Sequence, residues 1–559
     1  MQSLWGEEFQ LPNSKDKVDE ILEKINNPEH MSDDDFKKFM KNKKVSLTDK
    51  LQAIKKYVRR VLGEHINTTQ VIKSKEELVA YFDKVIESGY LAYDTETNNS
   101  LDAHTGHIIG LCLYSPNNLP AYVPIGHVDP FSEKRLDWQV SVEDCREQLQ
   151  RVKDNNVKII MHNGSFDYKF TYTTFGVKLH IYWDTMVGSR ILNENDYCAK
   201  LKWQYKDKID PSHPLYDIDK MFPDIPYIYV DPDTFALYSA TDAIMTYKLY
   251  EYQLKIFEQE DEKGAYRLFR DVESKLPEIT AEMELDGVKV DLDYAHRLEN
   301  KYTRLLSESE KELNEELERL RPQIEEWKLT PDATYRPKVY ANGKNAKGYP
   351  EKDEKGNFKY GKSKLEQLED PIKLSSPTQL AILFFDILKC ENLESESPRS
   401  TGKASLTYMA EEKHYSLPKK MLQYRTISKI LKDFIIKLPT MVNEKTGRIH
   451  CNFNQLGDED DAVVTGRFSC KSPNLQNIPS KNNEVRLLFC GDNVEHEINQ
   501  VNDYYEITKG DEVQLQDGSW LEVKDLQINN ILENNDVITN IVECDKYYKV
   551  FTKEVGDSN

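Results

Sequence analysis

Between residues 76 and 258 the chain alternates short apolar strands with helical stretches, and this alternation constrains the fold more than any other feature of the sequence. Strands are predicted at Gly89–Tyr93, Ile108–Tyr114 and Val157–Met161. Helical patterns separate these strands along the chain. Alternation of this kind is typical of an α/β domain. We therefore expect residues 76–258 to form such a domain.

Acidic side chains follow two of these strands and open a later helical stretch. Asp94 and Glu96 come directly after the strand residues LAY. Alternate residues of a strand point to the same side, so both carboxylates can face one cleft. Asp167 follows the strand VKIIM, and Tyr238 and Asp242 are four residues apart, which places them on one face of a helix. Together the three motifs predict one acidic site.

Clustered carboxylates without Cys or His ligands suit hard divalent cations such as Mg²⁺ or Mn²⁺. Two such ions about 3.5–4 Å apart stabilise both the attacking and the leaving oxygen of a phosphodiester. We expect Asp94 to bridge two ions, with Glu96 and Asp242 completing one of them. Asp167 would hold the other ion partly through water, and Tyr238 would orient the attacking water. The alternative for any one motif is a solvated surface pair, because the chain has 96 acidic residues.

The order and spacing of these motifs resemble the DEDD-type 3′→5′ exonucleases, in the variant with tyrosine. The flanking segments GHIIGLCLYS, AYVPIGH and WDTMVGSRILNEN agree with this resemblance. It implies a ribonuclease-H-like exonuclease domain that uses two Mg²⁺ or Mn²⁺ ions. It also implies catalytic roles for Asp94, Glu96, Asp167, Tyr238 and Asp242, metal binding by the four carboxylates among them, and a DNA contact at Asn163.

A second resemblance begins with the run TGRFSCKSPNLQNIP, from Thr465 to Pro479. This run resembles the entry to the palm of family A DNA polymerases. Other segments match in the same order: ELDGVKVD from Glu284, SSPTQLAILFFDIL from Ser375, STGKASL from Ser400, QYR from Gln423 and TGRIH from Thr446. The resemblance covers about residues 80–500 and is interrupted by an insertion at 330–365.

This second resemblance implies a set of DNA contacts. In the family, the arginine of the TGR motif contacts the nucleic-acid backbone near the primer terminus, and here that residue is Arg467. Arginine suits the role because its planar fork can bind a phosphate with two parallel hydrogen bonds. The alternative for Asn474 and Asn477 is a turn role beside the prolines. The implied DNA contacts are Arg425, Arg467, Asn474, Gln476, Asn477 and Arg486.

Patterns along the whole chain predict a multidomain protein with a mainly helical thumb region and a small β-rich C-terminal tail. Lys, Gly, Asn, Pro and Asp dominate the insertion at 330–365, which we expect to be flexible. The predicted segments are an N-terminal helical region at 1–75, the exonuclease domain at 76–258, linker helices and thumb at 259–440, the start of the palm at 441–489, and the tail at 490–559.

The family's catalytic palm motifs do not follow Pro479. There the family has a strand ending in an Asp-Tyr-Ser-Gln-Ile-Glu-like motif, whereas the tail offers Asp503-Tyr504-Tyr505-Glu506-Ile507, with Thr508 in place of glutamate. Neither an Arg-xxx-Lys helix nor a His-Asp pair follows. We therefore expect exonuclease activity from this chain and no primer extension. A second polypeptide or a C-terminal remainder would carry the palm and fingers.

The tail sequence KGDEVQLQDGSWLEVKDL resembles the opening strands of Hint domains, the fold of inteins. One hypothesis makes Cys490 the nucleophile of a split intein that joins two halves of the polymerase. However, Cys490 lies 20 residues before Gly510, and inteins place the nucleophile within a few residues of the first strand. The alternatives are a buried core cysteine and a β-rich insertion in the palm.

Charge and cysteine usage limit the location and the partners. The net charge is −21, yet nine Lys and Arg residues between Arg399 and Lys437 face only three acids, which predicts a local basic face or a solvated helix surface. Eight scattered cysteines without a CxxC pair favour a reducing cytoplasm, that of the host cell if the protein is viral. The sequence has no run of 18 apolar residues, which argues against a membrane span, and its N-terminus has no signal-peptide pattern.

The leading hypothesis is a phage-like family A DNA-directed DNA polymerase for DNA replication, present here with its proofreading exonuclease. Its partners would be a primer–template duplex, a single-stranded 3′ end and a processivity factor. Three alternatives stay open: a split-intein precursor half, a stand-alone 3′→5′ exonuclease, and a non-catalytic DNA-binding subunit. An adjacent reading frame with palm and fingers motifs would favour the interrupted polymerase.

Overall fold

A computed structural model of the chain describes residues 32–63, 66–194, 198–339, 352, 357–393, 398–455, 466–480, 482–489, 504–532, 536–543 and 547–554. The chain divides into two compact units. The first unit comprises Met1–Val288 and Asn443–Asn477, and the second comprises Lys289–Val442 and Ile478–Asn559. None of the described helices combines the length and the apolarity needed to cross a membrane.

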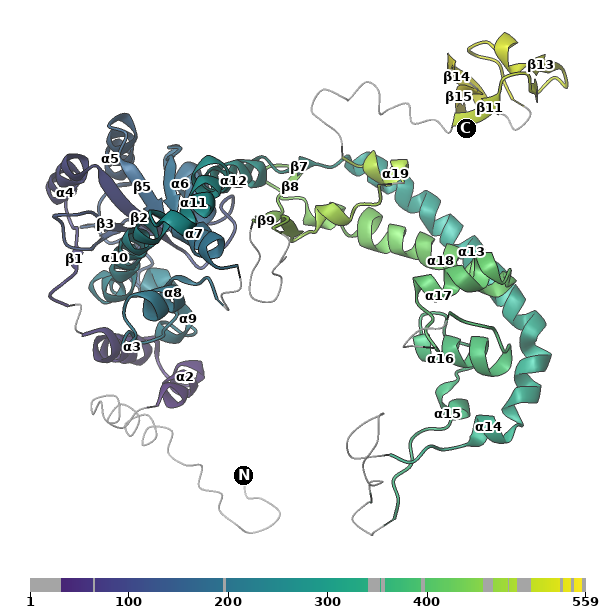
Figure 1. Ribbon diagram of the computed structural model, residues 1–559, viewed down its shortest axis with the longest axis horizontal. Helices are drawn as coiled ribbons and strands as arrows, with labels where there is room; N and C mark the ends of the chain where they lie inside the picture. The colour runs from purple at the N-terminus through teal and green to yellow at the C-terminus, as the bar shows by residue number, and fades with distance from the viewer. Residues whose placement is uncertain are drawn as a thin grey trace. The chain divides into compact units, whose positions relative to one another are not determined.

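A mixed six-stranded sheet organises the first unit, in the order β1-β4-β3-β2-β5-β6. The pairs β2–β3 and β3–β4 are antiparallel, whereas β1–β4, β2–β5 and β5–β6 are parallel. This sheet confirms the predicted α/β fold (Figure 1). The strands are β1 (Gln70–Val71), β2 (Tyr90–Thr97), β3 (Ile108–Tyr114), β4 (Ala121–Pro124), β5 (Lys158–Met161) and β6 (Ile181–Asp184).

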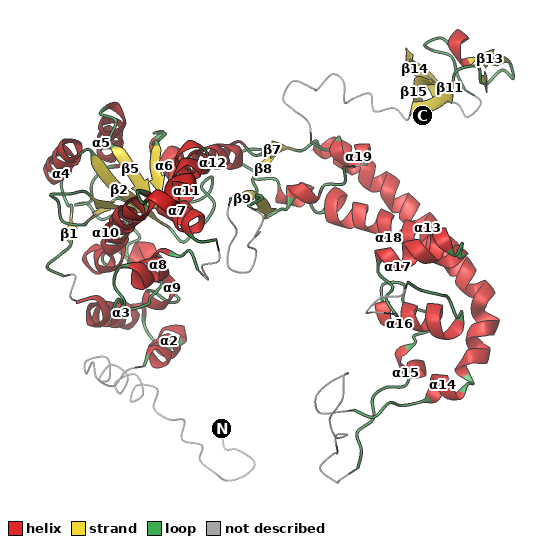
Figure 2. Cartoon of the chain, viewed as in Figure 1, coloured by secondary structure: helices red, strands yellow, loops and turns green. Residues whose placement is uncertain are grey.

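Helices cover both faces of this sheet, as the secondary-structure colouring shows (Figure 2). One apolar core joins Leu91 and Tyr93 of β2 to α4 (Lys75–Ser88), α5 (Val142–Asp154) and α6 (Gly164–Phe175). The other core joins Ala92 to α10 (Pro232–Phe257). Successive residues of β2 therefore face opposite layers, as the pleat of a strand requires.

The remaining helices of the first unit surround these two layers. Ser32 caps α2 by accepting a hydrogen bond from the N–H of Asp35. α2 and α3 share the core of α10. The bounds are α2 (Asp33–Lys41), α3 (Leu47–Leu62), α7 (Thr185–Leu192), α8 (Leu201–Lys208), α9 (Ile218–Met221), α11 (Lys263–Asp271) and α12 (Leu276–Asp286).

Part of the polymerase-like segment lies in this first unit. β9 (Asn452–Asn454) pairs antiparallel with β10 (Ser469–Lys471), and β8 (Arg448–Ile449) precedes them. Glu284 of α12 fastens the segment: its carboxylate accepts a hydrogen bond from the N–H of Phe453 at 2.5 Å and pairs with Lys169 of α6. The middle of β9 is thereby linked through Glu284 to the helix that carries Asp167.

The second unit is mainly helical, as predicted. α13 (Leu292–Lys328) has 37 residues and packs against α18 (Ser416–Lys429). Leucines of α13 and residues near Phe384 form its core. Shorter helices complete it: α14 (Pro331–Thr334), α15 (Lys364–Gln367), α16 (Pro377–Ala381), α17 (Lys403–Thr407) and α19 (Asn483–Arg486), with π-helical turns at Ile382–Ile387, Tyr408–Glu412 and Ile430–Ile436.

The C-terminal tail is β-rich, as predicted. β11 (Tyr504–Thr508), β15 (Tyr547–Glu554) and β14 (Asp536–Glu543) form an antiparallel sheet in that order. β12 (Glu512–Gln514) and β13 (Trp520–Glu522) form a hairpin. Of the segment compared above with the palm motif, Tyr504–Ile507 lies in β11. Asp503 and Cys490 lie outside the described residues.

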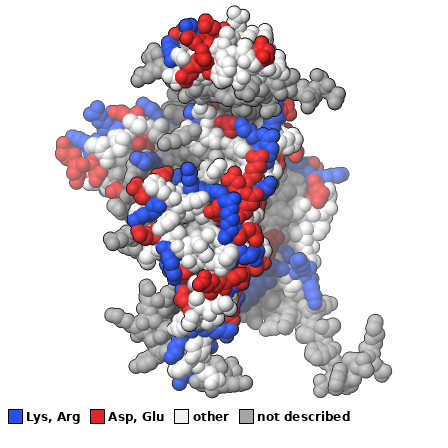
Figure 3. All heavy atoms as spheres, turned by 90° about the vertical axis from the view of Figure 1, so that its right-hand side faces the viewer, with Lys and Arg blue, Asp and Glu red and all other residues white. Residues whose placement is uncertain are grey.

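The predicted basic face of the second unit contains several ion pairs. Lys413 pairs with Glu391, Lys420 with Glu316 at 3.3 Å, and Arg399 with Asp386. On the face that Figure 3 presents, Lys and Arg side chains adjoin Asp and Glu side chains across much of the surface.

Candidate active site

The pleat of β2 turns two carboxylates toward α10. Asp94 and Glu96 lie two and four residues after Ala92, which packs in the core of α10. In the neighbouring strand β3, Cys112 lies opposite Asp94 in the pairing register. One ligand atom from each of Asp94, Glu96 and Cys112 lies within 4.8 Å of the other two. The predicted convergence of the first motif is therefore present.

The third motif lies on α10, where Tyr238 and Asp242 are both buried. A lysine from α8 joins them. The ammonium of Lys202 donates to Asp242 Oδ2 at 2.7 Å and to the hydroxyl of Tyr238 at 3.0 Å. The sequence patterns gave no indication of Lys202, because it belongs to none of the three motifs.

Asp167 reaches the same strand from the opposite layer. It lies in the first turn of α6, and its Oδ1 accepts hydrogen bonds from the N–H of Thr95 at 2.8 Å and from the hydroxyl of Thr95 at 2.7 Å. Since Thr95 stands between Asp94 and Glu96, this bond joins the second motif to the first. Asp94, Glu96 and Asp167 are thus joined through β2, and the charges of Asp242 and Lys202 act on both Asp94 and Glu96.

The turn between β5 and α6 holds Asp167 in place. Asn163 has a left-handed backbone, with φ of 63°, and Asp184 accepts the N–H groups of Asn163 and Gly164 at 3.2 and 2.7 Å. A Cβ at Gly164 would lie 2.9 Å from the side chain of Met161, so only glycine fits without a shift. The sharp turn explains why Asn and Gly precede this helix.

The four carboxylates carry more negative charge than their surroundings neutralise. Burial raises the pKa of Asp94 to about 7, and the charge of Asp242 adds to the rise. Burial and then the charge of Asp94 raise the pKa of both Glu96 and Asp167 well above the ordinary range. The pKa of Asp242 is also raised by burial, although Lys202 opposes the rise. Sites of this kind are built for function more often than for stability.

These residues fit a divalent metal ion. Oxygen ligands from clustered carboxylates are what Mg²⁺ and Mn²⁺ prefer. Oδ1 of Asp242 is buried, and no donor among the described residues hydrogen-bonds to it. A cation would satisfy that oxygen and relieve the repulsion that raises the carboxylate pKa values.

A cavity of about 550 Å³ opens at the carboxyl ends of β5 and β6. Asn163 lines it together with residues of the β9 segment. Four further lining residues are cationic: Lys169, Arg190, Lys200 and Lys471. Two acids, Asp184 and Glu284, also line the cavity, and Glu284 pairs with Lys169, so the lining keeps a smaller net positive charge. The sequence patterns singled out Asn163 and none of these cations.

The other predicted DNA contacts lie in both units. Arg467, Asn474, Gln476 and Asn477 of the first unit are exposed, and Oδ1 of Asn474 accepts the N–H of Gln476 at 3.1 Å. The side chain of Asn474 therefore also shapes a turn. In the second unit, Arg425 donates to the carbonyl oxygen of Thr401, and Arg486 is exposed at the end of α19.

Two segments of the chain match known protein families. Residues 69–257 match the 3′-5′ exonuclease family, and residues 352–508 match DNA polymerase family A. DNA polymerase I of Chloroflexus aurantiacus is 24% identical over 422 residues, which cover 74% of this chain and 38% of that protein. The DNA polymerase of Bacillus phage SP01 is 26% identical over 402 residues, covering 69% and 39%.

A solved structure has a similar fold. The POL domain of Pol1 from M. smegmatis, in complex with DNA primer-template and dNTP, matches with a TM-score of 0.52 at 16% identity, covering 80% of this chain and 61% of that one. The chain spans well under half the length of the polymerases that it resembles in sequence. It belongs to the family A DNA polymerases and contains a 3′-5′ exonuclease domain and part of the polymerase domain.

Proposed function

We propose that this chain removes nucleotides from the 3′ end of single-stranded DNA, as the proofreading exonuclease of a replicative family A polymerase. The observation that carries the proposal is the set of Asp94, Glu96, Asp167, Tyr238 and Asp242, with its raised carboxylate pKa values. This is the environment that a two-metal phosphodiesterase requires.

Asp94, Glu96, Asp167 and Asp242 would hold two Mg²⁺ or Mn²⁺ ions. When bound, these ions supply an activated water and neutralise charge on the phosphate. Burial and the charge of Asp242 raise the pKa of Tyr238 well above its ordinary value, so its hydroxyl stays protonated at neutral pH. Tyr238 can then donate a hydrogen bond that orients the attacking water. The products are a nucleoside 5′-monophosphate and a strand shortened by one nucleotide.

The cationic cavity supports a path for the single strand. The exposed side chains of Lys200 and Lys471 would bind backbone phosphates, and Asn163 would lie beside the strand. The exposed residues Arg467, Asn474, Gln476 and Asn477, with Arg425 and Arg486, are the proposed contacts to a primer–template duplex.

We infer that these 559 residues do not extend primers without further residues, from the same or a second polypeptide. They contain no match to the family's Asp-Tyr-Ser-Gln-Ile-Glu motif. The Tyr504–Ile507 segment that comes nearest to it pairs with β15 in the tail sheet. Primer extension by the purified chain, surviving Asp94→Ala, would overturn this inference.

The exonuclease proposal is tested with 5′-labelled single-stranded DNA and Mg²⁺ or Mn²⁺. We expect a ladder of products shortened from the 3′ end, and a rate lowered about 10³-fold or more by Asp94→Asn or Asp242→Asn. Glu251→Gln is the matched control, because Glu251 lies on α10 with Asp242 but is exposed. Full cleavage by either Asn variant would refute the proposal.

A further inference from the structure

The exonuclease site contains a positive charge of its own. Lys202 is only 13% exposed at its side chain, and its ammonium lies 2.7 Å from Asp242 Oδ2. It also lies 4.3 Å above the ring of Tyr238 and 5.1 Å from the ring centre of Tyr216. An ammonium held by a carboxylate and two aromatic faces is a built feature of the site rather than a surface side chain.

Lys202 acts on three of the four carboxylates. Its charge opposes the rise in pKa of Asp94, Glu96 and Asp242 alike. The carboxylate of Asp242 is divided between two environments: Oδ2 is bound to Lys202, and Oδ1 is buried with no hydrogen-bond donor among the described residues. A divalent cation that bound both oxygens of Asp242 would meet the ammonium at Oδ2.

We propose that Lys202 is the internal counter-ion of the exonuclease site, which competes with a divalent cation for Asp242 and is displaced from it when the cation binds. The proposal rests on the metal-dependent exonuclease function proposed above. In the metal-free protein, Lys202 reduces the repulsion among Asp94, Glu96 and Asp242. Its cost is weaker metal binding, because the cation must take the place of a charged hydrogen bond.

Lysine is suited to such an exchange. Its ammonium carries three donors on a flexible four-carbon stem, so one bond can be released while others stay. The hydroxyl of Tyr238 at 3.0 Å and the two tyrosine rings offer places for the charge after Asp242 is released. The freed ammonium would therefore stay beside the tyrosine that orients the attacking water.

The test measures Mn²⁺ binding to the DNA-free protein, with free Mn²⁺ followed by electron paramagnetic resonance. We expect Lys202→Met to bind Mn²⁺ about tenfold more tightly, because one opposing unit charge is removed from a partly buried site. Lys206→Met is the matched control: Lys206 lies on the same helix but donates to the carbonyl oxygen of His213 at 2.8 Å. Equal affinities for Lys202→Met, Lys206→Met and the unchanged protein would overturn the proposal.

A second measurement covers the case in which Lys202→Met does not fold. Lys202→Gln keeps a hydrogen-bond donor without the charge, and it should also bind Mn²⁺ more tightly than the unchanged protein. In EDTA, both variants should melt at a lower temperature than Lys206→Met, and Mn²⁺ should remove that difference. A difference that persists at saturating Mn²⁺ would mean that Lys202 serves packing alone.

The outcomes separate this proposal from the exonuclease function. If the unchanged protein binds Mn²⁺ but cleaves no single-stranded DNA, the proposed function fails, and a tighter Lys202→Met still supports competition for Asp242. If cleavage is normal and the Mn²⁺ affinities are equal, the exonuclease function stands and the role of Lys202 is wrong. Asp94→Asn should weaken Mn²⁺ binding in both backgrounds, which assigns the measured ion to this site.

Discussion

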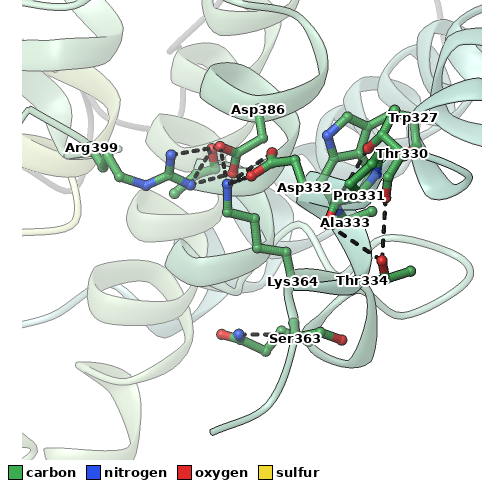
Figure 4. A network of polar contacts seen from close by, with 12 residues as sticks. Trp327, Thr330, Pro331, Asp332, Ala333, Thr334, Ser363, Lys364, Asp386 and Arg399 are labelled. Carbon is green, nitrogen blue, oxygen red and sulfur yellow. Dashed lines mark hydrogen bonds and ion pairs between the residues drawn. The ribbon is translucent and has the colours of Figure 1, made fainter. Parts of the chain in front are cut away.

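Two buried aspartates, one in each unit, have opposite electrostatic surroundings. Asp386 of the second unit is 5% exposed, and Asp242 of the exonuclease domain is 8% exposed. Asp386 accepts hydrogen bonds from Lys364 at 2.8 Å and from both terminal nitrogens of Arg399, and Lys364 is itself bound to Asp332 (Figure 4). Asp242 has Lys202 at one oxygen, and no hydrogen bond from the described residues at the other.

The difference appears in the pKa values. Burial would raise the pKa of Asp386, but the hydrogen bonds and charges of Arg399 and Lys364 outweigh it and lower the pKa. At Asp242 burial prevails over the single lysine, and the pKa is raised. Asp386 is thus a structural carboxylate compensated by two cations, whereas Asp242 is more deeply buried, has one cation and keeps an oxygen open to a further ligand.

The largest effect that this comparison predicts is on the stability of the second unit. Asp386→Ala removes the partner of Lys364 and Arg399, and we expect a loss of about 2–3 kcal/mol, below the full cost of an orphaned buried charge because both cations are partly exposed. Hydrogen exchange of α15, α16 and the Ile382–Ile387 turn, followed in urea, would measure it.

Asp332→Ala is the control for that change. Asp332 is 49% exposed at its side chain and binds Lys364 without contributing to the buried end of the network. We expect a loss of less than about 1 kcal/mol from it, as for other exposed ion pairs. If the two variants lose the same free energy of unfolding, the ion pairs of Asp386 do not stabilise this region more than an exposed ion pair does.

The same comparison predicts that removing a charge from the exonuclease site stabilises it. At pH 8 in EDTA, Asp94→Asn should raise the free energy of unfolding of the first unit by about 1–2 kcal/mol, since it removes the charge that, after burial, contributes most to the raised pKa of Glu96 and Asp167. The variant should at the same time lose cleavage. Urea denaturation monitored by hydrogen exchange of β2 and α10 checks it, with Glu251→Gln as the control. A destabilised Asp94→Asn would mean that Asp94 is a structural carboxylate like Asp386.

Local patterns predicted the parts of this site that depend on local geometry. Strand alternation placed Asp94 and Glu96 on one side, and helical spacing placed Tyr238 and Asp242 together, as the structure has them. Lys202 was missed because it lies 40 residues from Asp242, on a helix without a motif. Cys112 was missed because its place opposite Asp94 depends on the β2–β3 register.

The same limit applies to the second unit. The charges from Arg399 onward predicted a basic face. However, Arg399 forms an ion pair with Asp386, 13 residues away, and this pair exists only in the folded structure. The helical character of this unit and the β-rich tail were predicted, and the tail strands β12 and β13 pair as a hairpin. Pairings between distant charges follow from tertiary packing and leave no local pattern.

The smallest predicted effect is a pH dependence of opposite sign in the two regions. The pKa of Asp94 is raised to about 7 in the folded chain, above its unfolded value of about 3.9, so the folded state binds a proton that the unfolded state does not. Stability in EDTA should therefore increase as the pH falls through 7, by at most about 1.4 kcal/mol per pH unit. Asp386, with its lowered pKa, loses its contribution only below the ordinary aspartate range.

The measurement compares the unchanged protein with Asp94→Asn in EDTA at pH 8 and pH 6. At pH 8 the variant should be the more stable, and at pH 6 its advantage should shrink by about 1 kcal/mol, because protonation then does in the unchanged protein what the substitution does in the variant. Saturating Mg²⁺ should abolish the stability that the unchanged protein gains between pH 8 and pH 6, since the ion competes with the proton for the same oxygens. An advantage that is constant between the two pH values would show that Asp94 is ionised throughout and that its surroundings are as well compensated as those of Asp386.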